Sequence, residues 1–212
     1  MNRIILVLIL VVTFSCMDNK KKEPSVVSKE VVEKQYNLIK NFTIDEMELW
    51  SKVRVNLEAS NEVEYSEAAY NLSRNSETES AYLSSGLIPV TYSSEYMVSI
   101  IVKKGVNNNL FGLRISGVYP DRVDAIFDLD KGIVVDYRTA QDFENAEATI
   151  VKLSDGWYKC TLSSEVSADN IKIVMGATSA ENSITSWEGK SENQGGIFFV
   201  PTSVTIEEVI VN

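Results

Sequence analysis

One polar segment near the C-terminus combines an aromatic ring with several side chains that form hydrogen bonds. Trp187 stands in SITSWEGKSENQGG, a setting in which a core tryptophan is less expected. Sugars present flat apolar C–H faces and many hydroxyls, so a site for them needs an exposed aromatic ring with planar polar groups nearby. Trp187 is therefore the first candidate for stacking on a sugar, with a structural cap at the end of the fold as an equal alternative. The polar residues that flank it are Glu188, Lys190, Glu192, Asn193 and Gln194.

Other aromatic residues could extend such a site. Trp50, in DEMELWSKVRV, could join the same loop cluster, although packing in the core is the favoured interpretation. Tyr92, Tyr119 and Tyr137 stand near the expected ends of strands and are weaker candidates. The predicted ligand-binding set is therefore Trp187, Glu188, Lys190, Asn193, Gln194 and Trp50.

The composition restricts catalysis. The chain contains no histidine, which excludes Ser-His-Asp and Cys-His groupings, histidine metal sites and histidine general bases. Its ten glycines are scattered and form no phosphate-binding loop. Pairs of carboxylates can hydrolyse glycosides. Among 30 acidic residues, however, proximity in sequence identifies no such pair.

The N-terminal residues have the anatomy of an export signal. One arginine precedes the apolar run IILVLILVV, and TFS leads to Cys16. The run is too short for a membrane-spanning helix, which needs about 20 residues. The segment resembles the lipobox of bacterial lipoproteins, although Thr13 and Phe14 depart from that pattern. We expect a signal peptide over residues 1–15 and a lipid on Cys16, with ordinary cleavage nearby or an uncleaved anchor as alternatives.

Such an anchor would attach the protein to a membrane of the bacterial cell envelope, with the outer membrane as the expected location. Residues 16–40 are expected to form a flexible tether, because their start lacks apolar mass to bury, and SKEVVEKQYNLIK could add a helical turn or two. Residues 41–212 are expected to form one domain with a full core. The net charge of −10 disfavours nucleic acid as a partner.

The stretch SDGWYKCTLS contains the second cysteine of the chain. With Cys16 lipidated, Cys160 has no partner for an intrachain disulfide. It alternates with Tyr158 and Leu162 on one strand face, which predicts a buried, inert thiol. Trp157 begins this strand on the opposite face, where a structural plug is favoured over a half-exposed ring.

The remaining sequence has the period-two pattern of β-strands separated by turns. The clearest strand, EYMVSIIVKKG, places Tyr96, Val98, Ile100 and Val102 on one face. NLFGLRISG and VDAIFDL alternate in the same way, and the dipeptide Asp155-Gly156 predicts a hairpin turn. About ten such strands without a long helix favour an all-β sandwich. The inward-facing residues of the second and third segments are expected to be Phe111, Leu113, Ile115, Val123, Ala125, Phe127 and Leu129.

Five sequence features occur in a characteristic order. They are Trp50, the strand EYMVSIIVKKG, FDL followed by a glycine, DGWYKC, and WEG followed by GIFFV. In this order they resemble a jelly-roll, carbohydrate-binding-module-like domain of phage fibre and head-spike proteins and of bacterial surface glycan-binding proteins. The resemblance covers residues 45–211, with VPTSVTIEE in place of the family's WGAQLE. It implies a two-sheet antiparallel jelly-roll sandwich, and it transfers function less well, because most shared residues are packing and turn positions.

Three functions remain open. The leading hypothesis is non-catalytic glycan binding by an envelope lipoprotein. The alternative is a structural or adhesive envelope module that binds protein, and a jelly-roll polysaccharide lyase or hydrolase is disfavoured by the missing histidine. No cofactor is expected. The resemblance allows a structural calcium ion, which needs six to eight oxygen ligands, but no ligand can be named.

Overall fold

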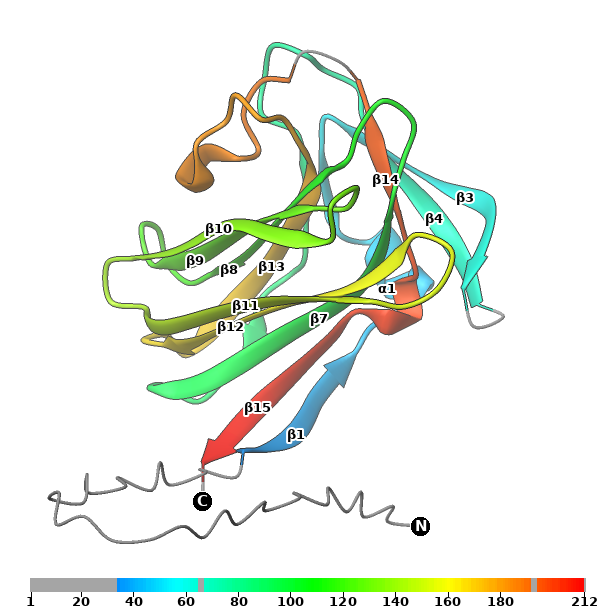
Figure 1. Cartoon of the computed structure of the whole chain (residues 1–212). Helices are drawn as coiled ribbons and strands as arrows, with labels where there is room; N and C mark the ends of the chain where they lie inside the picture. Colours follow the sequence, from blue (N-terminus) through cyan, green and yellow to red (C-terminus); the bar gives the residue numbers. More distant parts are fainter. Residues whose placement is uncertain (1–33, 65–66, 192–193, 212) are drawn as a thin grey trace, which may run out of the picture. The chain divides into compact units, whose positions relative to one another are not determined.

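The computed structural model describes residues 34–64, 67–191 and 194–211. Within these residues, two antiparallel β-sheets of eight and seven strands pack face to face (Figure 1). The prediction of an all-β, two-sheet antiparallel jelly-roll sandwich is confirmed. We call the eight-stranded sheet A and the seven-stranded sheet B.

Sheet A consists of β1 (Lys34–Asn41), β3 (Val55–Glu64), β4 (Glu67–Arg74), β7 (Ser94–Lys104), β11 (Glu144–Lys152), β12 (Trp157–Val166), β14 (Gly196–Phe199) and β15 (Thr205–Val211). Sheet B consists of β2 (Ser51–Val53), β5 (Tyr82–Ser84), β6 (Ile88–Pro89), β8 (Leu110–Ser116), β9 (Arg122–Asp128), β10 (Ile133–Ala140) and β13 (Asn170–Thr178). The short helices are α1 (Ile44–Glu48), η1 (Ile184–Ser186) and η2 (Pro201–Ser203).

The core lies between the two sheets and follows the predicted alternation. Tyr96, Val98, Ile100 and Val102 of β7 are all buried, because side chains two residues apart share one face of a strand. The seven residues of β8, β9 and the position after β9 that were expected to face inward are buried as well. The strand-face predictions for these segments are confirmed.

Tight turns join neighbouring strands where the sequence predicts them. The turn between β11 and β12 contains Asp155 and Gly156, which have φ angles of 43° and 84°. Glycine adopts such positive angles without steric cost. The predicted hairpin at Asp155-Gly156 is therefore confirmed.

The extended C-terminal segment is interrupted between β14 and β15. η2 separates β14 from β15, and both strands pair with β7. Between them, the Ile101 N–H donates to Ser203 Oγ at 2.9 Å, and the Val200 N–H donates to the Ile101 carbonyl at 3.1 Å. The proline at position 201 thus lies at an irregularity of the sheet, as proline in strands generally does.

The N-terminal boundary of the domain differs from the prediction. Residues 34–41 form β1, which pairs with β15 over Lys34–Val211 to Asn41–Thr205. The flexible tether was expected to extend to residue 40, and a helical turn or two was considered over SKEVVEKQYNLIK. For residues 34–40 both expectations are wrong, because backbone pairing with a strand about 170 positions away orders them. The expected signal peptide, Cys16 and the first part of the tether lie outside the described residues.

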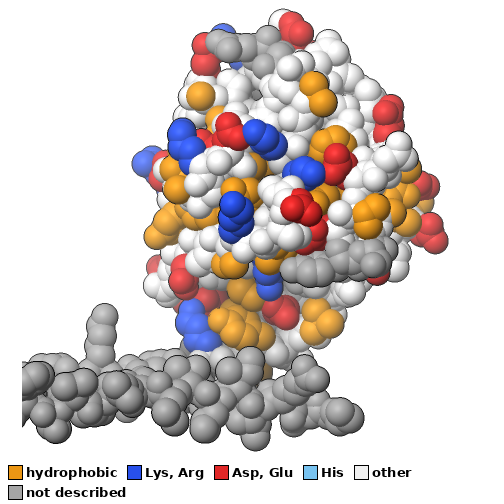
Figure 2. All heavy atoms as spheres, turned by 45° about the vertical axis from the view of Figure 1, so that its right-hand side comes forward, with side chains coloured by type: hydrophobic (Ala, Val, Ile, Leu, Met, Phe, Trp, Pro, Cys, Tyr) orange, Lys and Arg blue, Asp and Glu red, His pale blue; other side chains and the backbone are white. Residues whose placement is uncertain are grey.

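The face shown in Figure 2 has no large patch of a single charge. Acidic, basic and hydrophobic side chains are mixed across it. In the described ranges, no helix is both long and apolar enough to cross a membrane.

Candidate functional site

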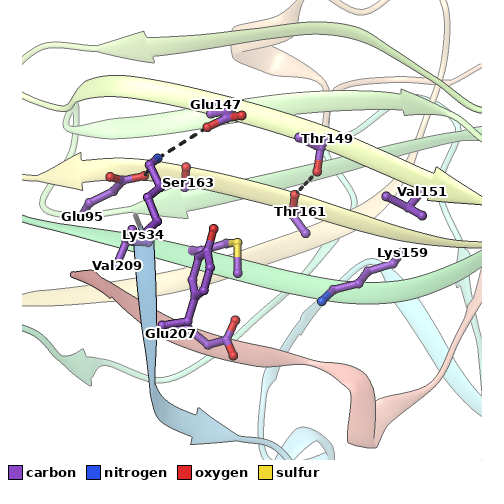
Figure 3. Close-up of a pocket in the computed structure, with 12 residues that line it drawn as sticks. Lys34, Glu95, Glu147, Thr149, Val151, Lys159, Thr161, Ser163, Glu207 and Val209 are labelled. Atoms are coloured by element: carbon purple, nitrogen blue, oxygen red, sulfur yellow. Dashed lines mark hydrogen bonds and ion pairs between the residues drawn. The ribbon is translucent and has the colours of Figure 1, made fainter. Parts of the chain in front are cut away.

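A hollow of about 450 Å³ lies on the outer face of sheet A. Five adjacent strands, β11, β12, β7, β15 and β1, form its floor (Figure 3). We call it the outer groove. Its lining side chains are Lys34, Tyr36, Glu95, Met97, Glu147, Thr149, Val151, Lys159, Thr161, Ser163, Glu207 and Val209.

Strand register explains why these side chains gather. Directly opposite residues of antiparallel strands point to the same face. One row across the sheet runs from Glu147 through Ser163 and Met97 to Glu207. A neighbouring row joins Glu95, Val209 and Tyr36. The inward-facing partners on the same strands form the core, so the fold itself places the intervening residues in the groove.

The charged side chains of the groove are partly paired. Lys34 Nζ lies 3.2 Å from Glu95 Oε1 and 3.7 Å from Glu147 Oε2 (Figure 3). Burial lowers the pKa of Lys34, but the hydrogen bond and charge of Glu95 outweigh it, so the net pKa lies above the ordinary value. Lys159 lies at the other end of the groove, and Glu207 projects from β15 between them (Figure 3).

Hydroxyl and apolar groups complete the surface. Thr149 and Thr161 face each other across β11 and β12, and their hydroxyls form a hydrogen bond (Figure 3). Tyr36 is 52% exposed and is the aromatic residue of the groove. The groove therefore offers an exposed ring, carboxylates, ammonium groups and hydroxyls on one open face. Side chains of these kinds can stack on a ligand with many hydroxyls and form hydrogen bonds to it.

The structure contradicts the prediction that Trp187 is a stacking platform. Its side chain is fully buried against the outer face of sheet B, with Ile126, Val174 and Ile184 around it. The Nε1–H of Trp187 donates to Asp124 Oδ1 at 2.9 Å. Trp187 is the structural cap that was considered as its alternative.

A buried ion cluster fixes this cap. Asp124 accepts hydrogen bonds from Arg114 Nε at 2.6 Å and from Arg122 Nε at 3.0 Å. Arg114 also donates to both carboxylate oxygens of Glu188, at 3.1 and 3.0 Å. Charges removed from water require such partners. Glu188 therefore anchors the loop to sheet B, and the expectation that it contacts a ligand beside an exposed Trp187 is wrong.

The other predicted ligand-binding residues do not converge either. Trp50 is 6% exposed and packs edge-on against Phe42, with ring centroids 5.1 Å apart, so it is a core residue. Lys190 and Gln194 are exposed, but no exposed tryptophan stands beside them within the described residues. Asn193 lies outside the described residues. The predicted set Trp187, Glu188, Lys190, Gln194 and Trp50 is thus not a joint site.

The two interpretations of DGWYKC are confirmed. Trp157 is 1% exposed and packs with Ala69 and Val200 on the outer face of sheet A, where Lys103 Nζ lies 5.7 Å from the centroid of its ring. Cys160 is a free thiol inside the core, and burial raises its pKa well above the ordinary value. Such a thiol has little thiolate character.

Sequence reasoning missed Tyr36 and the outer groove. The alternation of Lys34, Tyr36 and Leu38 was a signal, because these residues share one face of β1. It stood in a segment assigned to the tether and was therefore not interpreted as a strand. The described residues also contain no group of three or more acidic or cysteine side chains that could hold a metal ion.

No family model and no curated protein matches the chain. One similar solved structure, described as "CBM4 structure and function", has 12% identity and a TM-score of 0.37, and the match covers 73% of this chain and 79% of that chain. Another is a carbohydrate-binding module, TmCBM27, studied for specific mannan recognition; it has 10% identity and a TM-score of 0.40, with 82% of this chain and 98% of that chain covered. Likenesses this weak assign no function to this chain.

Proposed function

We propose that this protein is a non-catalytic carbohydrate-binding lipoprotein of the bacterial cell envelope, and that it binds a polysaccharide in the outer groove of sheet A. The observation that carries the proposal is the half-exposed ring of Tyr36 on the same open face as Glu95, Glu207, Thr161 and Lys159. The ring provides a surface for the apolar face of a sugar, and the polar groups provide donors and acceptors for its hydroxyls.

The dimensions of the groove favour an extended ligand. Five strands separated by about 4.8 Å span about 19 Å, which is enough for several consecutive sugar rings. The groove is open along the sheet rather than enclosed, so a chain can cross it without ending in it. A polysaccharide is therefore a better match than a free monosaccharide.

The experiment is a glycan-array screen of the chain carrying Cys16→Ser, followed by calorimetric titration of each ligand found. Tyr36→Ala should weaken binding by about 1–3 kcal/mol, a magnitude taken from the stacking of aromatic side chains on planar ligands. Tyr137→Ala is the matched control, because Tyr137 is a 45% exposed tyrosine on sheet B. Equal affinities of the Tyr36 and Tyr137 variants would remove the outer groove from the binding site, and a screen without any ligand would remove glycan binding.

The anchor is tested separately. Mass spectrometry of the protein from bacterial membranes should show acyl groups on Cys16, and Cys16→Ser should move the protein to the soluble fraction. An unmodified Cys16 would leave glycan binding intact and refute the lipoprotein part of the proposal.

A second candidate function is adhesion to an envelope protein. β10 is an edge strand of sheet B, and Ile133, Val135 and Tyr137 on it are 46%, 51% and 45% exposed. Exposed apolar edge strands are templates for pairing with another chain. A protein partner whose binding is lost with Val135→Lys and kept with Tyr36→Ala would favour this function over glycan binding.

A further inference from the structure

One end of the sandwich exposes apolar side chains that the fold does not bury. Three loops at this end, after β5, after β6 and after β8, contain Leu87, Tyr92, Val118 and Tyr119, which are 67%, 59%, 79% and 81% exposed. Leu87, Tyr92 and Val118 converge on one hollow of about 360 Å³. Contiguous exposed apolar groups of this kind mark contact surfaces.

The charges at this end restrict what the surface contacts. Asp121 and Asp169 line the same hollow, and the guanidinium of Arg122 lies 5.5 Å from the ring centroid of Tyr119. The loops of this end, residues 85–87, 90–93, 117–121 and 167–169, carry these carboxylates and no lysine, so they do not attract anionic lipid. Tyrosine rings with apolar neighbours instead suit the interfacial region of a bilayer, where the ring is partly buried and the hydroxyl stays hydrated.

The chain enters the domain at this same end. Lys34, the first described residue, pairs with Val211, and its ammonium lies 3.2 Å from Glu95 near the start of β7. The Ser93 N–H, just before β7, donates to the Val166 carbonyl at the end of β12. β1 therefore begins at the sandwich end where the loop of Tyr92 lies, next to the start of β7.

The length of the preceding segment limits how far this end can lie from the anchor. Seventeen residues separate Cys16 from Lys34. Even fully extended, they reach at most about 60 Å, at about 3.5 Å per residue. A lipid on Cys16 would therefore hold the loop tips at high effective concentration beside the bilayer, so that weak insertion suffices for occupancy.

We propose that this end of the sandwich faces the membrane, and that the tips carrying Leu87, Tyr92, Val118 and Tyr119 insert into the interfacial region of a zwitterionic phospholipid bilayer. The inference rests on the anchor proposed at Cys16. It orients the domain with one end on the lipid surface. The outer groove then runs along the side of the sandwich, with Lys34 and Glu95 nearer the membrane and Lys159 farther from it.

The test uses depth-dependent quenching of a single introduced tryptophan. The acylated protein, verified by mass, is placed in vesicles of phosphatidylcholine and phosphatidylethanolamine whose phosphatidylcholine carries bromine at a shallow acyl position. Val118→Trp should show a blue-shifted emission that bromine quenches. Val106→Trp is the matched control, since Val106 is a 73% exposed valine in the hairpin after β7, at the opposite end of the sandwich, and its emission should stay unquenched.

The three native tryptophans contribute little to quenching, because none is more than 6% exposed. Both replaced valines are exposed, so urea unfolding midpoints should match that of the parent chain and exclude misfolding. Equal quenching of the two variants, or none at position 118, would overturn the membrane-facing orientation.

Failure of the anchor is distinguishable from failure of this inference. If Cys16 carries no lipid, the same two variants are measured on the unacylated chain at high lipid concentration. Selective quenching at position 118 would then support insertion without an anchor, and its absence would refute insertion. Glycan binding is independent of both outcomes, because the Tyr36→Ala comparison measures it.

Discussion

A methyl group added at Gly112 would collide with the ring of Trp187. An ideal Cβ at this position of β8 lies 2.2 Å from Cε3 and 2.3 Å from Cδ2 of the indole. The ring cannot move freely, since it is fully buried and its Nε1–H is bonded to Asp124. Gly112→Ala should therefore lower the free energy of unfolding by about 1–3 kcal/mol, the usual cost of overpacking.

Removing the ring of Trp187 should abolish or reverse the destabilisation caused by Gly112→Ala. Trp187→Ala alone should cost about 3–5 kcal/mol, as expected for truncation of a buried tryptophan. In that background the obstacle to the methyl group is gone, and alanine within a strand is favoured over glycine by about 0.5–1 kcal/mol. Gly112→Ala should then become neutral or stabilising, so the two changes are coupled.

The assay is urea unfolding of the four proteins of this cycle, followed by far-ultraviolet circular dichroism. Gly176→Ala is the matched control, because Gly176 is the partner of Gly112 on β13 and its Cβ would lie 3.6 Å from the indole. That variant should cost less than Gly112→Ala. An equal cost of Gly112→Ala with and without Trp187 would refute the packing, and a Trp187→Ala chain of unchanged stability would restore the exposed platform expected from the sequence.

Two further outcomes follow from the structure. Burial acts to raise the pKa of Asp128, but hydrogen bonds from Lys131, Asp130 and Asn109 outweigh it and lower the pKa from 3.8 to about 2. A carboxylate with a depressed folded-state pKa stabilises the fold above its unfolded pKa, so about 2 kcal/mol should be lost as the pH falls from about 4 to 2, and Asp128→Asn should remove this dependence in acid unfolding curves. Cys160, buried with a raised pKa, should not react with a thiol reagent in the folded Cys16→Ser chain and should react fully in urea; rapid reaction of the folded chain would contradict its position in the core.

Local patterns predicted the parts of the fold that depend on neighbouring residues. The alternation in β7 determined which side chains enter the core, and Asp155-Gly156 determined a turn, because both are properties of a few consecutive residues. The role of Trp187 depends instead on Gly112 and Asp124, which lie more than sixty positions away and whose proximity no local pattern reveals. Tyr36 was missed for a different reason: its segment alternates like a strand, but it was assigned to the tether, and only pairing with β15 orders it.

The location of the candidate site follows from which outer faces are already occupied. On sheet B, the loop around η1 places Trp187 on Gly112, and the ion cluster of Asp124, Arg114 and Glu188 closes the face beneath it. On sheet A, Trp157 lies under Lys103, whose ammonium pairs with Glu62 of β3 at 2.7 Å. The face formed by β11, β12, β7, β15 and β1 has no such cover among the described residues, and its hollow combines charged and hydroxyl groups with the half-exposed ring of Tyr36. An open face of this kind is where a ligand can replace water, which is why the outer groove, rather than the tryptophan loop, is the surface to test first.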